Sequence, residues 1–93
     1  MAGRSRREQE VRKQAAAGRA AYGTRKIDDR DLFVAASVQP SGDDFIVTID
    51  YYRAVGAFGD SIKEESRAFP GADEALDFLT EVTGIALADL RIG

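Results

Sequence analysis

The sequence contains neither cysteine nor histidine. Without cysteine, the chain can form no disulfide, no thiolate nucleophile and no cysteine metal site, and a reducing cytoplasm is the compartment we expect. Without histidine, it lacks the commonest general base and the commonest transition-metal ligand. These two absences remove the usual routes to catalysis and to metal binding, so we expect no cofactor.

Long hydrophobic runs are also missing. No stretch approaches the roughly 18 apolar residues of a membrane span, and the basic start of the chain is not followed by the hydrophobic core of a secretory signal. Glu8 and Glu10 count against an organellar transit peptide, because such peptides avoid acidic residues. We therefore expect a cytoplasmic protein that has no membrane partner.

The net charge of −3 conceals an uneven distribution. Residues 1–30 carry nine Lys or Arg and four Asp or Glu, a net charge of +5, whereas residues 31–93 carry four basic and twelve acidic residues, a net charge of −8. Such an asymmetry indicates charged partners. We predict a basic helical arm over residues 1–26, a linker over 27–30 and a β-β-β-α body over 31–93.

The clearest strand pattern lies in residues 44–53, which contain no Gly or Pro. Every second residue is large and apolar, as in a strand with one buried face. Residues 31–38 alternate in the same way, and the turn-forming residues 39–43 predict an antiparallel hairpin with Val38 opposite Phe45. The buried face of the central strand is expected to consist of Phe45, Val47, Ile49 and Tyr51.

A third strand is predicted after a tight two-residue turn that places Val55 opposite Phe58. In that register Asp50 faces Lys63 across the sheet, which is a favourable pair. Glu64 would then share the buried face of the sheet. This conflict favours either an edge strand whose end is exposed to water or a β-bulge near the glycines that shifts the register.

Two segments have helical character. Residues 72–83 show an apolar face at helical spacing, with Gly84 placed to end the helix and Ile85 to pack beside it. Residues 4–22 consist mostly of good helix formers, but their apolar stripe is thin. We expect this second helix to end at Gly23.

The predicted fold class is α+β. A three-stranded antiparallel β-meander, over residues 31–38, 44–53 and 60–68, carries the C-terminal helix on one face. The basic N-terminal helix is either mobile or docked on the other face. Residues 85–92 form either a fourth strand or a tucked turn, because periodicity alone does not separate the two.

Carboxylate pairs are the only arrangement that suggests catalysis. Asp43 with Asp44, and Glu64 with Glu65, resemble in composition the two carboxylates of a glycosidase. Adjacent strand residues point to opposite faces, so neither pair converges, and a chain of 93 residues leaves little room for a cleft. We therefore do not expect an enzyme.

The expected function is protein binding by a small adaptor or inhibitor. The sheet face opposite the C-terminal helix presents an aromatic and aliphatic cluster, and the outer side of that helix is acidic, which together suit a protein interface. The small size and the charge split resemble those of phage-borne inhibitors of nucleic-acid machines, such as anti-CRISPR proteins. The predicted protein-binding residues are Phe33, Ile46, Tyr52, Asp73, Asp77 and Glu81.

The alternative is RNA or DNA binding by the arm. Basic residues on a helix can follow a phosphate backbone, because each neutralised phosphate releases a counterion. Residues 5–21 resemble the arginine-rich RNA-binding helix of lambdoid phage antitermination proteins, with Gly18 where that helix has a stacking aromatic. The residues expected to bind nucleic acid are Arg4, Arg6, Arg7, Arg12, Lys13 and Arg19.

Overall fold

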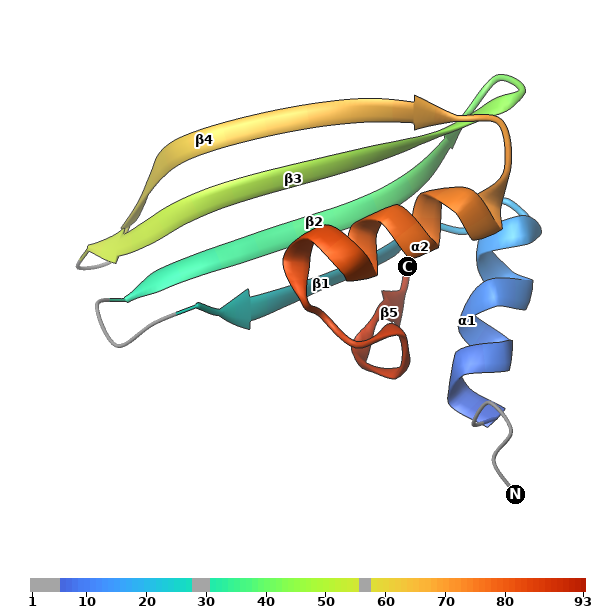
Figure 1. The fold of residues 1–93 in the computed structure, drawn as a ribbon, viewed down its shortest axis with the longest axis horizontal. Coiled ribbons are helices and arrows are strands. Elements are labelled where there is room, and N and C mark those ends of the chain that lie inside the picture. The colour runs from blue at the N-terminus through green and yellow to red at the C-terminus, as the bar shows by residue number, and fades with distance from the viewer. Residues whose placement is uncertain (1–5, 28–30, 56–57) are drawn as a thin grey trace.

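The protein forms one five-stranded antiparallel sheet with two α-helices on the same face (Figure 1). The computed structural model describes residues 6–27, 31–55 and 58–93. The strand order is β4-β3-β2-β1-β5. The elements are α1 (Arg6–Ala16), β1 (Ala21–Lys26), β2 (Leu32–Ser41), β3 (Asp44–Val55), β4 (Phe58–Phe69), α2 (Ala72–Thr83), the 3₁₀ helix η1 (Leu87–Asp89) and β5 (Arg91–Ile92).

The α+β class is therefore confirmed, but the sheet has two more strands than the three we predicted. The first is β1, which forms where we expected the end of the basic helical arm. The helix ends at Ala16, and Gly18, with φ of 96°, lets the chain turn toward the sheet. From there β1 pairs with β2, with Ala21 opposite Val38.

The hairpin between β2 and β3 is tighter than expected. Val38 lies opposite Val47, and not opposite Phe45 as predicted, because the turn consists of two residues with Gly42 at φ of 62°. The difference in register is two residues. A shift of two keeps every side chain on its own face, so the predicted faces of both strands remain correct.

The pairing of β3 with β4 includes the predicted register of Val55 opposite Phe58. Further along, the register shifts between Tyr51 and Tyr52, which leaves Ile62 as an extra residue in β4. Asp50 consequently faces Glu64 and not Lys63. The bulge was one of the two alternatives left open. It turns Glu64 to the face that carries no helix, together with Ser66 and Ala68.

The core lies between the sheet and the two helices. Leu76 and Leu79 of α2 are fully buried against the inner face of the sheet, where Ile49 is also fully buried. The predicted bounds of this helix are confirmed, as is its end at Gly84, which has φ of 75°. Helical spacing assigned Val82 to the apolar face of this helix, but it lies at the margin of the sheet and is 41% exposed.

The N-terminal helix docks beside α2, on the same side of the sheet, and not on the opposite face (Figure 1). Val11 and Ala15, the main members of its thin apolar stripe, are both buried. Residues 85–92 contain both alternatives that the sequence allowed, a tucked turn at η1 followed by β5. Strand β5 pairs with β1, with Ile92 opposite Ala21, and it is the second of the two strands beyond the predicted three-stranded meander.

Candidate protein-binding surface

One face of the sheet carries neither of the two α-helices that the structure describes, and we call it the uncovered face. It is formed by every second side chain of β1 to β4 and by Arg91 of β5, on the side away from α1 and α2. No element of the described part of the chain packs on it. In antiparallel sheets that expose one face to solvent, apolar residues on the buried face usually alternate with polar residues on the exposed face. Several aromatic and aliphatic side chains depart from that pattern here.

An aromatic pair occupies one end of the uncovered face. Phe33 of β2 lies directly opposite Tyr52 of β3, and their rings stack at 5.5 Å between centroids with 16° between planes. Lys26 of β1 lies opposite Phe33. Ile46 also faces this side, but it lies six residues from Tyr52 along β3, or about 20 Å. The structure thus brings together two of the three predicted sheet residues and places the third at the opposite end.

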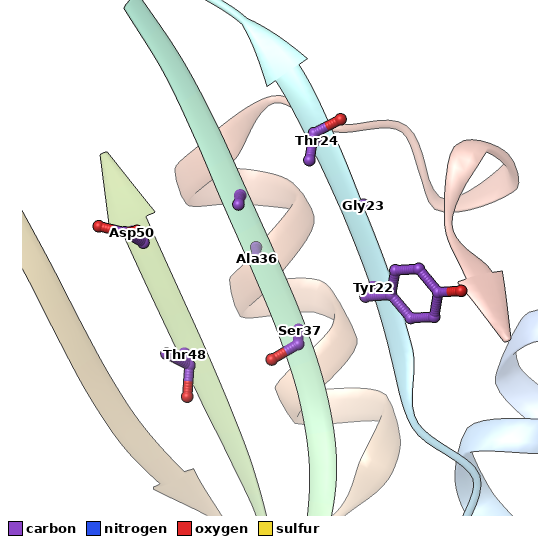
Figure 2. A pocket seen from close by; sticks show the side chains of 8 residues that line it. Tyr22, Gly23, Thr24, Ala36, Ser37, Thr48 and Asp50 are labelled. Carbon is purple, nitrogen blue, oxygen red and sulfur yellow. The ribbon is translucent and has the colours of Figure 1, made fainter. Parts of the chain in front are cut away.

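A shallow hollow of about 230 Å³ lies in the middle of the same face (Figure 2). Ala35 and Ser37 of β2 are small, so the taller side chains of Tyr22 on β1 and Thr48 on β3 rise on either side. In Figure 2 these strands lie in front of α2. Tyr22 is 43% exposed, more than either Phe33 or Tyr52.

The charges on the uncovered face are separated by sign. Lys26 on β1 and Arg91 on β5 are basic, whereas Asp50 on β3 and Glu64 on β4 are acidic. The central strand β2 contributes no charged residue to this face. Because the strand order is β4-β3-β2-β1-β5, one half of the face is acidic and the other half is basic.

The acidic side of α2 lies on the other side of the sheet and has a partner within the protein. Arg12 of α1 donates hydrogen bonds to Asp73 Oδ1 at 2.8 Å and to Asp77 Oδ1 at 2.6 Å. The hydrogen bond to Asp77 raises the pKa of Arg12, with desolvation opposing it and Asp73 adding to the rise. Glu81 remains exposed. The six predicted protein-binding residues therefore fall on two separate surfaces.

The basic helix also contacts the body of the protein. Arg7 donates hydrogen bonds to the carbonyl oxygens of Ala88 and Leu90, and Arg12 is bound as described above. The remaining described members of the predicted nucleic-acid-binding set are exposed, namely Arg6, Lys13 and Arg19. Arg4 lies outside the described residues. At least two of the six predicted cations therefore already have partners within the chain.

A second hollow, of about 520 Å³, lies on the helix side of the sheet beyond the C-terminal end of α2. It arises because a 12-residue helix is about 18 Å long, whereas the 12-residue strands β3 and β4 are about 40 Å long. Ile62, 54% exposed, and Val82 are apolar side chains at its wall. Periodicity did not reveal it, since it depends on the relative lengths of packed elements.

The described residues form neither a cluster of acidic side chains that could hold a metal ion nor a membrane-spanning helix. Among residues 6–27, 31–55 and 58–93, no three acidic side chains lie close enough to hold a metal ion. None of the helices described is long and apolar enough to cross a membrane. Glu64 and Glu65 do not converge, since they lie on opposite faces of β4.

No protein-family model, curated protein or solved structure matches the chain.

Proposed function

We propose that the protein is a small non-enzymatic binding module that recognises a protein partner with its uncovered face. The observation that supports this most is the stacked pair of Phe33 and Tyr52 on a face that none of the described elements covers. Aromatic residues are enriched in protein interfaces, where they supply a large contact area at low cost in conformational entropy. Tyr22 adds a third aromatic side chain to this face.

The acidic side of α2 is a weaker candidate for the binding surface than the sequence suggested. Arg12 already forms ion pairs with Asp73 and Asp77, and a partner that used these carboxylates would have to compete with it. Nucleic-acid binding by α1 is less favoured for the same reason, because Arg7 and Arg12 have partners within the protein. We therefore assign binding to the sheet and not to either helix.

Site-specific photo-cross-linking tests the proposal. A benzophenone amino acid replaces Tyr22, whose exposed ring it resembles, in the full chain expressed in cells. The control carries the same amino acid at Gln9, which is exposed on α1. We expect a discrete protein adduct from position 22 and none from position 9. No adduct from position 22, or equal adducts from both positions, would refute the assignment of this face.

A further inference from the structure

We propose that the partner of the uncovered face is a second copy of the same chain, packed face to face around a two-fold axis parallel to β2. The inference rests on the proposed function, because it names the partner of the same surface. It is based on the separation of charge across that face, on the small side chains along β2 and on the area of the sheet.

The charge distribution makes the face complementary to itself. A two-fold axis that lies in the interface along β2 exchanges the two halves of the sheet, so the basic half of one copy covers the acidic half of the other. Lys26 and Arg91 then lie over the half that carries Asp50 and Glu64. An axis across the strands would place like charges together.

These four charged side chains have little competition from partners within one chain. Lys26 Nζ lies 3.9 Å from Asp31 Oδ1, and both side chains are more than half exposed, so this pair contributes little. Asp50 accepts a 2.8 Å hydrogen bond from the neutral hydroxyl of Ser61. Within the described residues, Arg91 and Glu64 form no salt bridge.

The shape of the face fits the same axis. The two copies of β2 lie over one another, and the small side chains of Ala35 and Ser37 permit close approach there. Tyr22, Ser37 and Thr48 lie at one level across the strands. The rotation therefore places the exposed ring of Tyr22 over Thr48 of the second copy, at the wall of its hollow.

The area of the face allows a weak dimer. In this arrangement the ten residues of β2 lie over their own copy, the six residues of β1 lie over β3 and the two residues of β5 lie over β4, which gives overlaps about 33, 20 and 7 Å long at a strand spacing of about 4.8 Å. The two faces together would bury roughly 800 Å², which is in the range of weak, transient interfaces. We therefore expect a dimer whose dissociation constant is on the order of micromolar or higher.

Charge reversal tests the arrangement. The first variant combines Lys26→Glu with Arg91→Glu, so that its face carries only acidic residues. The second combines Asp50→Lys with Glu64→Lys, so that its face carries only basic residues. Analytical ultracentrifugation should show a wild-type dimer, two variants that are monomeric when alone, and a one-to-one dimer in their equimolar mixture. Each reversal alone should weaken self-association at least tenfold.

The controls separate this effect from a general change of charge. Lys13→Glu on α1 and Glu81→Lys on α2 alter exposed residues on the other side of the sheet, and both should leave the wild-type dimer intact. Circular dichroism establishes that each variant is folded. If a double variant does not fold, the mixing experiment uses the single changes Arg91→Glu and Glu64→Lys in place of the double variants. Both positions are exposed.

The outcomes distinguish the two proposals. A cross-linked adduct from position 22 with twice the mass of the chain, together with rescue in the mixture, supports the second copy. A wild-type chain that stays monomeric at millimolar concentration overturns the second copy, as does a dimer whose variants do not rescue each other. If position 22 then cross-links a protein of another mass, the proposed function stands without the second copy. If the chain forms no dimer and position 22 gives no adduct, both proposals are overturned.

Discussion

Arg12 of α1 donates a 2.6 Å hydrogen bond to Asp77 of α2, and this ion pair joins the basic N-terminal helix to the acidic C-terminal helix. A second hydrogen bond from the same guanidinium reaches Asp73. The side chain of Arg12 is only 17% exposed. Part of the charge asymmetry between the two ends of the chain is thus satisfied within the molecule.

Replacing Arg12 with Ala should destabilise the protein by about 1–2 kcal/mol, between the values for an exposed ion pair and for a hydrogen bond to a charged group. The loss includes the packing of its aliphatic stem. Urea denaturation measures this change. The matched control is Lys13→Ala, at the adjacent exposed position, which should cost less than about 0.5 kcal/mol. Equal losses in both variants would mean that the contact with Asp77 contributes nothing specific.

The elements that the sequence predicted well are those with strong local patterns. The helix over residues 72–83 has a full apolar face and a glycine directly after it, and its bounds are as predicted. Strands β2 and β3 alternate over many residues, so their faces are correct even though their register is not. In both cases many residues contribute to one periodicity of apolar side chains, so the assignment of faces does not depend on any single residue or on the exact pairing of strands. The faces of β4 were predicted wrongly, because a bulge at Ile62 reverses them.

The missed elements depend on partners that are distant in sequence. Strand β1 has one fully buried side chain, Ala21, and it forms because β2 and β5 pair with it on both sides. The position of α1 beside α2 likewise follows from contacts between residues more than sixty positions apart, such as Arg12 and Asp73. No short window of sequence contains either relationship.

The candidate site was likewise predicted only in part: the face on which each residue lies was predicted, but the contacts between residues were not. Alternation alone placed Phe33, Ile46 and Tyr52 on one face. It did not show that Phe33 stacks on Tyr52, because that requires the exact register of the hairpin. It also did not show the separation of charge across the face, because that depends on the order of strands in the sheet.

Gly23 provides a test of how β1 packs. A Cβ at this position would lie 2.9 Å from Leu90 Cδ2 and 3.3 Å from Ile85 Cγ2, and both side chains are buried. Gly→Ala changes without strain usually stabilise a protein, because they restrict the unfolded chain. Gly23→Ala should instead destabilise it by about 1–3 kcal/mol through overpacking.

Thermal or urea unfolding of Gly23→Ala gives the sign of the effect directly. Thr24→Ala is the neighbouring control on the same strand, at an exposed position whose side chain lies on the uncovered face. Its effect should be within about 0.5 kcal/mol of zero, as for most exposed substitutions. An increase in stability in the Gly23 variant would show that Leu90 does not pack over β1 as described.

The stack of Phe33 on Tyr52 should couple the two residues energetically. We expect a double-mutant cycle with Phe33→Ala and Tyr52→Ala to give a coupling of about 0.5–1.5 kcal/mol in favour of the folded state. The cycle is measured by urea denaturation in the Arg91→Glu background, in which any self-association through the uncovered face is weakened. The coupling then reports contacts within one chain.

Phe33 with Ile46 is the control pair, since both residues lie on the uncovered face but about 20 Å apart along the strands. Substitutions at that distance are expected to be additive within about 0.5 kcal/mol. A coupling of Phe33 to Tyr52 no larger than this would mean that the rings do not stack in the isolated chain. A larger coupling would show that the aromatic end of the face is already ordered before a partner binds, which lowers the entropic cost of binding.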